Sequence, residues 1–154
     1  MIAAIPNAMW GEIERHEDDK GRVIVPEEFR EALGATFVVT RGPDRCIYVF
    51  PIQIWEGIEE QVREQVLDRD VGFIQRMFGG RCLVKVDAQA RMALPRHLRE
   101  WAQIDRDHAV VIVGLGQKLE IWSKPNWDAY NAEFTSARMY GAVERAGLAA
   151  AIGR

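Results

Sequence analysis

The chain has 154 residues, of which 48% are hydrophobic and 28% charged, and its formal net charge at pH 7 is -3. No apolar run approaches the length of a membrane span, the start lacks the basic segment and apolar core of a secretory signal, and the two cysteines fit no zinc-binding spacing. The sequence therefore argues against a membrane protein and indicates an ordinary globular protein of the cytoplasm with reduced cysteines.

The negative charge is concentrated in residues 56–70, which hold six acidic and two basic residues and so a net charge of -4. The rest of the chain is left with a net charge of +1. Because an acidic helix can coexist with a basic face elsewhere, the total charge neither supports nor excludes a nucleic-acid partner.

The first predicted elements are a strand over 10–17, a turn at Asp19-Lys20-Gly21 and a β-branched strand at Val23-Ile24-Val25. Pro26 then begins a helix, because its fixed φ suits the first helical position and two glutamates follow it near the positive end of the helix dipole. Gly34 is expected to end this helix.

A hairpin comes next along the chain. Its strands are predicted over 37–40 and 46–50, on either side of Gly42-Pro43-Asp44, which is typical of a turn. The fold therefore begins with two short strands, a helix and a hairpin.

Helices connect this unit to the rest of the chain. A predicted helix after Pro51 carries an apolar stripe with one residue every four positions, and a shorter helix that ends at Gly79-Gly80 follows it. The stripe and the second helix contribute Ile54, Ile58, Val62, Val66, Phe73 and Phe78. This is more apolar surface than one side of a small barrel needs, so part of it is expected to bury at a subunit interface.

The second half of the chain repeats the first. Residues 87–100 repeat 18–31 at an offset of 69, with Asp, Arg, Pro, Arg and Glu in the same places, and 110–127 repeat 38–55 at an offset of 72. Duplication at this period indicates two units that complete each other's core. Strands are accordingly expected near 82–86, 91–94, 109–113 and 118–122, with a helix from Pro95 and a closing helical region over 127–152.

The repeated loop is the strongest candidate site. Asp18 and Arg22 lie four apart across a turn, as do Asp87 and Arg91, and each carboxylate could hold its guanidinium and direct the remaining N–H donors. An exposed ion pair contributes only about 0 to 1 kcal/mol to stability, which is a weak structural reason to carry it twice. The alternative is that both aspartates only shape the turn by binding their own backbone.

Other kinds of site find little support. Asp19 beside Asp18 would suit acid–base chemistry, but the second copy has Ala88 in that place. Gly114-Leu-Gly116 lacks the third glycine of a dinucleotide fingerprint, and the three histidines are scattered. We therefore expect no enzyme activity, no metal, no cofactor and no small-molecule substrate.

At these residues the chain resembles the MraZ family of bacterial transcriptional regulators. The resemblance covers roughly residues 10–134 and rests on the ordered segments DDKGRVIVPEEFRE, VVTRG, YVFPIQIW, MFGGRCLVKVDAQARMALPRHLRE and VVIVGLGQKLEIWSKPNWDAY. It implies a mainly β fold with helices, a pseudo-twofold double-split β-barrel of two AbrB-like swapped-hairpin repeats. The expected divisions are a first repeat at 10–55, a helical connector at 56–80, a second repeat at 81–127 and a C-terminal helical region at 128–154.

The resemblance also implies a function. Members bind direct repeats in the promoter of the division and cell-wall gene cluster as ring oligomers, so double-stranded DNA and further copies of the chain are the expected partners, and the nucleoid is the expected location. The Asp-x-x-x-Arg loops of the family face DNA, which transfers here to Asp18 and Arg22 with Lys20, and to Asp87 and Arg91.

Each residue of the loops then has an expected role. An Arg22 at the tip of a hairpin could donate twice to guanine in the major groove, while Lys20 and Arg15 meet phosphates and Gly21 supplies the flexible turn. The second loop departs from the family pattern through Ala88 and Ala90, because alanine disfavours positive φ and no amine is left to meet a phosphate. The first loop is therefore expected to make the main contact.

The rival interpretation is a protein-binding module, because related swapped-hairpin domains serve as antitoxins that grip a protein through a tail. Such tails are typically disordered and polar, whereas 124–152 contains Trp127, Tyr130, Phe134, Met139 and Leu148 and is expected to be ordered.

Overall fold

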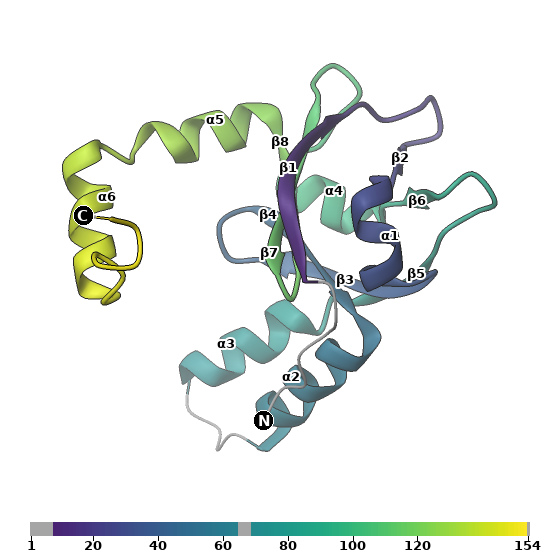
Figure 1. Ribbon diagram of the computed structural model, residues 1–154. Coiled ribbons are helices and arrows are strands. Elements are labelled where there is room, and N and C mark those ends of the chain that lie inside the picture. Colours follow the sequence, from purple (N-terminus) through teal and green to yellow (C-terminus); the bar gives the residue numbers. More distant parts are fainter. Residues whose placement is uncertain (1–7, 65–68, 154) are drawn as a thin grey trace.

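Two β-sheets with helices packed around them make up the fold. The computed structural model describes residues 8–64 and 69–153 (Figure 1). The elements in chain order are β1 (Met9–Arg15), β2 (Arg22–Ile24), α1 (Glu27–Leu33), β3 (Thr36–Gly42), β4 (Cys46–Pro51), α2 (Ile52–Glu64), α3 (Arg69–Phe78), β5 (Cys82–Lys85), β6 (Arg91–Ala93), α4 (Arg96–Ala102), β7 (Val110–Gly116), β8 (Leu119–Ser123), α5 (Lys124–Ala132) and α6 (Ser136–Arg145).

The strands of the two repeats pair with each other. The larger sheet has the order β1-β7-β8-β4-β3-β5, and β2 pairs with β6 in a second, two-stranded sheet. Strands β1, β4 and β3 thus find antiparallel partners in β7, β8 and β5 of the other repeat. This confirms the mainly β fold of two intertwined repeats. The barrel is not closed, since β1 and β5 form the two edges of the larger sheet.

Equivalent residues of the two repeats fill the same places in the core. Phe29 of α1 and Leu98 of α4, 69 positions apart, are both completely buried, and so are Val23 of β2 and Met92 of β6. Both helices follow a proline at the N-cap position, Pro26 and Pro95. Each repeat therefore inserts one helix and one short strand into a shared core, as a unit that cannot cover its apolar face alone.

Some helix boundaries differ from those that the sequence predicts. Pro26 and Pro95 cap α1 and α4 and precede their first helical residues, Glu27 and Arg96. The closing helical region begins at Lys124, before the predicted start at Trp127. Helix α6 ends at Arg145, and residues 146–153 form turns in place of the helix predicted to 152, because Gly147 with φ of 71° leaves the helical conformation. The predicted stripe residue Val66 lies outside the described residues.

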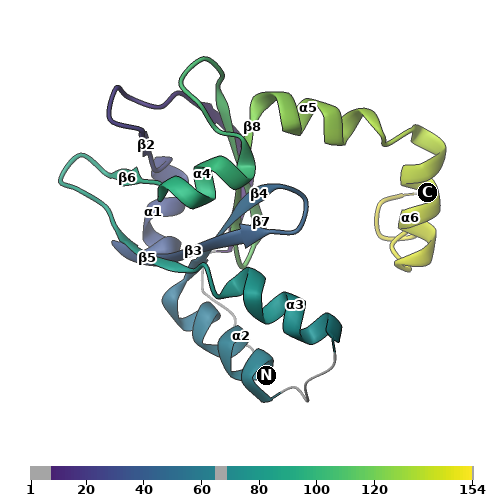
Figure 2. The same cartoon turned by 180° about the vertical axis from the view of Figure 1, so that it is seen from behind.

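The ends of the molecule differ in character. Helices α2 and α3 lie at one end, and the loops β1–β2 and β5–β6 lie side by side at the other (Figures 1 and 2). Helices α5 and α6 form an arm that extends away from the sheets (Figures 1 and 2). Among the helices that the structure describes, none is long and apolar enough to cross a membrane.

Candidate nucleic-acid interface

The first loop is held together by one aspartate. Oδ1 of Asp18 accepts hydrogen bonds from the backbone N–H groups of Lys20 and Arg22, each at 2.9 Å, and Oδ2 accepts from Nε of Arg22 at 2.8 Å. Gly21 donates its N–H to the carbonyl of Asp18 at 3.0 Å and has φ of 71°. The carboxylate therefore both shapes the turn and holds the guanidinium, so the two roles that the sequence left open are combined.

The second loop repeats this arrangement. Oδ1 of Asp87 accepts from the N–H groups of Gln89 and Arg91 at 3.0 and 2.9 Å, and Oδ2 accepts from Nε of Arg91 at 2.7 Å. Ala90 adopts φ of 58°, close to the value of its counterpart Gly21. The backbone reason for doubting the second loop is therefore wrong: the bonds of Asp87 hold alanine in the left-handed conformation.

The two loops are also linked to each other. Strand β2 pairs with β6, and this places Nη1 of Arg22 3.6 Å from Oδ2 of Asp87, and Nη1 of Arg91 3.9 Å from Oδ2 of Asp18. The four side chains form a reciprocal cluster, hereafter the Asp–Arg quartet, in which each carboxylate faces the arginines of both repeats. Sequence spacing predicted only the pairs within each loop.

The hydrogen bonds within each loop favour the charged form of its aspartate. The backbone N–H of Arg22 is the main reason that the pKa of Asp18 lies below its ordinary value, and the N–H of Arg91 lowers the pKa of Asp87 in the same way. The quartet thus keeps two negative and two positive charges and is neutral as a unit.

The arginines lie at the base of the loops, contrary to the expected position of Arg22 at the tip. Arg22 and Arg91 are the first residues of β2 and β6, and their side chains are 24% and 29% exposed. The exposed tip of the first loop is formed by Asp19 and Lys20. The partly buried Arg15 ends β1, where its guanidinium donates to the carbonyl of Glu14.

A third contact at the first loop is not predicted by the sequence. Nε and Nη2 of Arg99, on α4, donate to Oε1 and Oε2 of Glu17, both at 2.8 Å. These residues are 82 positions apart, so spacing does not reveal the pair. The one signal in the sequence is the difference between repeats next to the repeated aspartate, where Glu17 has Val86 as its counterpart.

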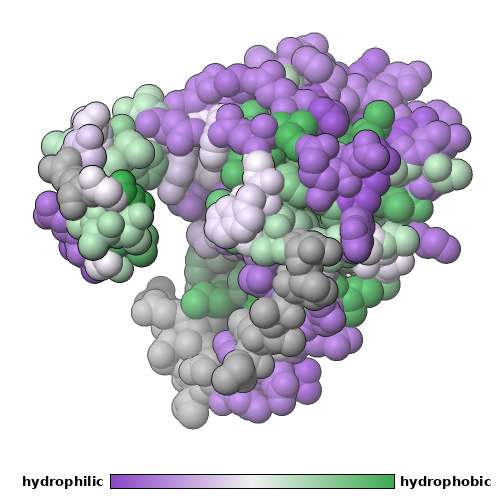
Figure 3. Space-filling view, viewed as in Figure 1, coloured by the Kyte–Doolittle hydropathy of each residue, from purple (hydrophilic) through white to green (hydrophobic). Residues whose placement is uncertain are grey.

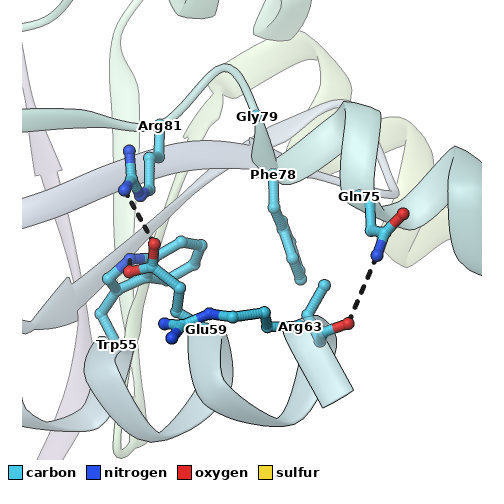
Figure 4. A pocket seen from close by; sticks show the side chains of 8 residues that line it. Trp55, Glu59, Arg63, Gln75, Phe78, Gly79 and Arg81 are labelled. Atoms are coloured by element: carbon cyan, nitrogen blue, oxygen red, sulfur yellow. Dashed lines mark hydrogen bonds and ion pairs between the residues drawn. The ribbon is translucent and has the colours of Figure 1, made fainter. Parts of the chain in front are cut away.

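A second candidate site is a cavity of about 330 Å³ between α2 and α3. Figure 4 shows the side chains that line it. Trp55 and Phe78 form its apolar wall, and Glu59 accepts hydrogen bonds from Arg81 at 2.8 Å and from Nε1 of Trp55 at 3.0 Å (Figure 4). The hydrogen bond from Arg81 lowers the pKa of Glu59. These contacts join α2 to the start of the second repeat, which is a structural role.

The position of the acidic stretch is compatible with a DNA-facing surface elsewhere. Helix α2, which carries much of that stretch, lies at the end of the molecule opposite the two loops (Figures 1 and 2). The end that carries the loops has a largely hydrophilic surface (Figure 3). No group of three or more potential metal ligands occurs within the part of the chain that the structure describes.

Intertwined repeats with paired Asp-x-x-x-Arg loops define a swapped-hairpin β protein of two repeats. The profile of the family described as "MraZ protein, putative antitoxin-like" matches residues 9–73 and 77–149. The chain belongs to the MraZ family.

Several relatives in this family are named "Transcriptional regulator MraZ". The protein of Desulforamulus reducens is 42% identical over 125 residues, which are 80% of this chain and 87% of that protein. The protein of Natranaerobius thermophilus is 42% identical over 129 residues, 82% of this chain and 89% of its own. That of Carboxydothermus hydrogenoformans is 43% identical over 122 residues, 78% and 84% of the two chains.

Proposed function

We propose that this chain is a sequence-specific DNA-binding transcriptional regulator that sets its two Asp-x-x-x-Arg loops against double-stranded DNA. The observation that carries the proposal is the Asp–Arg quartet, which joins both loops into one surface at the end of the molecule away from the acidic α2. The names of the relatives support it. In this proposal 10–55 and 81–127 are the two DNA-facing repeats, 56–80 connects them and 128–154 is the C-terminal helical region.

The geometry of Arg22 suits base recognition. Its Nε–H is held by Asp18, while the two Nη groups carry the four remaining donors. Guanine offers O6 and N7 as two acceptors in the major groove, and a guanidinium whose orientation is fixed loses less entropy when it binds both. Arg91 presents a guanidinium in the second loop as well, but its Nη2 also donates to Oε1 of Gln89 at 3.1 Å. Lys20 and Arg15 supply phosphate contacts.

A single pair of loops makes few contacts, and its neutral quartet gives little nonspecific attraction. A ring oligomer would present several such pairs along direct repeats, in the promoter of the division and cell-wall gene cluster. The second contact then becomes intramolecular and raises affinity through effective concentration. A cytoplasmic, nucleoid-associated location follows from this proposal.

The second candidate function is that of an antitoxin-like module that binds a protein. Apolar residues exposed on and after α6, Met139, Leu148 and Ile152, favour a protein contact for the arm. A purified chain that forms a stable complex with a protein from its own operon, and ignores its own promoter, would favour this second function.

The test is a titration of the chain on a duplex from the region upstream of its own gene, with a scrambled duplex as reference. Arg22→Ala should cost about 1 to 3 kcal/mol per engaged loop and reduce the preference for the specific duplex. Lys20→Ala should weaken binding to both duplexes and lower the salt slope by about one unit for each phosphate that Lys20 neutralises.

Arg91→Ala is the matched control for the difference between loops. Because only the first loop has an amine at its tip, this variant should be less damaging than Arg22→Ala. Equal binding of wild type to both duplexes would contradict the proposed function, and a greater effect of Arg91→Ala would make the second loop the main reader.

A further inference from the structure

A partly buried ion pair holds the first loop on its inner side. Glu17 directly precedes the loop aspartate, its side chain is 0% exposed, and both of its oxygens accept from Arg99 at 2.8 Å. Two parallel bonds between a planar guanidinium and a planar carboxylate fix orientation as well as distance. Arg99 belongs to α4, whose Leu98 and Ala102 are completely buried, so the loop is tied to a helix of the other repeat.

The same guanidinium lies against the turn of the loop. A Cβ atom built on Gly21 would meet Cζ of Arg99 at 3.3 Å and Nη2 at 3.4 Å. Arg99 therefore supports the backbone at Gly21, immediately beside Lys20 at the tip. Glycine at this position permits both the positive φ and the close approach of the guanidinium.

The second loop lacks the carboxylate–guanidinium link and is held differently, because the carbonyl of Ala90 accepts from the backbone N–H of Val25 at 2.9 Å. The counterpart of Glu17 is Val86, which offers no carboxylate, and the counterpart of Arg99 is Arg30. Nε of Arg30 donates to the carbonyl of Val25 at 2.9 Å. The two loops thus share the bonds of the quartet and differ in what holds them to the helix.

We propose that Arg99, held by Glu17, is a positioning residue that sets the first loop for DNA binding and thereby makes the two loops unequal. The proposal rests on the proposed function. Arg99 acts on DNA through the loop: it fixes the backbone under Gly21 and so the place where the Lys20 amine meets the phosphate backbone. The first loop thus carries both the Lys20 amine and the contact with Arg99.

The test uses the full chain and titrations at several salt concentrations on the upstream duplex. Arg99→Lys keeps the charge but offers one ammonium in place of the fork, so it should lower affinity several-fold and reduce the salt slope toward that of Lys20→Ala. The double variant with Lys20→Ala should reduce affinity little further, because both changes remove the same phosphate contact. Arg30→Lys, on the equivalent helix, is the matched control and should leave the slope unchanged.

A merely structural role predicts a different pattern. Partial unfolding of Arg99→Lys would lower the active fraction equally at every salt concentration and leave the slope as in wild type. Amide hydrogen exchange tests the role of Arg99 without DNA. The amide of Gly21 should exchange faster in Arg99→Lys, while the amide of Ala90 should exchange as in the wild-type protein. If Arg99→Lys folds poorly, Glu17→Gln, which keeps the shape of the side chain, replaces it in every measurement.

The outcomes separate the two proposals. If the wild-type chain does not bind the upstream duplex, the proposed function is wrong. The exchange rates at Gly21 and Ala90 then decide whether Arg99 supports the first loop. Wild-type binding together with an unchanged slope and unchanged exchange in Arg99→Lys overturns this inference alone. Full additivity with Lys20→Ala would also overturn it.

Discussion

Each loop aspartate uses one oxygen for the backbone and the other for its arginine. Asp18 accepts two N–H groups at Oδ1 and the guanidinium of Arg22 at Oδ2, so removal of the arginine side chain leaves the turn with its backbone bonds. The ion pair is about a quarter exposed, so solvent screens it and it contributes little to stability. We therefore expect Arg22→Ala to change DNA binding far more than stability.

The lowered pKa values of Asp18 and Asp87 predict a dependence on acid pH. In the folded protein both carboxyls lose their proton below the ordinary value of 3.8, so the unfolded chain binds more protons just below that pH. The stability that these groups contribute is thus fully present above pH 3.8 and is lost as pH falls through the folded pKa values. Urea denaturation at a series of pH values measures this loss.

The comparison is with a chain that carries Asp18→Asn and Asp87→Asn. The free energy of unfolding of wild type should exceed that of the double variant at neutral pH, and the difference should shrink as the medium becomes more acid. A difference that stays constant across the acid range would mean that the two carboxyls are not stabilised by the bonds described here.

At the scale of elements, the two loops show how one backbone shape is reached with different residues. Gly21 has φ of 71° and Ala90 has φ of 58°, and the same three bonds to an aspartate hold each turn. Alanine in this region is strained by about 1 to 2 kcal/mol. Glycine removes the strain, but its greater flexibility in the unfolded chain offsets part of the gain in stability. Ala90→Gly should therefore stabilise the protein by about 0.5 to 1 kcal/mol.

Gly21→Ala is the matched opposite change. It should destabilise the protein by more than Ala90→Gly stabilises it, because the new Cβ would also lie 3.3 Å from Cζ of Arg99. Chemical denaturation of the three proteins measures both effects. A destabilising effect of Ala90→Gly would show that Ala90 carries no strain.

Local patterns were sufficient for most of the elements. The repeated prolines indicated where both short helices start and Gly34 indicated where the first one ends, and β-branched runs predicted most strands to within a few residues. Local patterns could not predict the contacts between the repeats. Arg22 faces Asp87 because β2 pairs with β6, and Arg99 reaches Glu17 because α4 packs beneath the first loop. The positive φ of Ala90 was also not predicted, because the hydrogen bonds of the Asp87 side chain outweigh the intrinsic backbone preference of alanine.

At the scale of the whole molecule, apolar side chains are exposed at several separate places. Trp10 on the edge strand β1 is 70% exposed, Leu83 on the opposite edge strand β5 is 67% exposed, and Phe73 on α3 is 60% exposed. The arm adds Met139 of α6, and Figure 3 shows apolar surface there. Of the predicted stripe, Ile54, Ile58 and Phe78 pack on the core of the same chain.

Exposed apolar surface at different places favours contacts between unlike faces of neighbouring copies, which close into a ring when the rotation allows it. Burial of one large apolar side chain contributes about 1.5 to 3 kcal/mol, so a charge introduced there should weaken assembly markedly. We expect light scattering to report a mass well above one chain at micromolar concentration, and Phe73→Glu to shift the distribution toward smaller species.

Gln61→Glu is the control, because it adds the same charge at an exposed position of the neighbouring helix α2 without removing apolar surface. If assembly serves DNA binding, Phe73→Glu should also weaken binding to a duplex with several repeats while binding to a single repeat stays as in wild type, since the change removes only the multivalent advantage. A monomeric wild type at micromolar concentration would contradict assembly. An unchanged mass in Phe73→Glu would remove α3 from the interface and leave the sheet edges and the arm as the contacts to test.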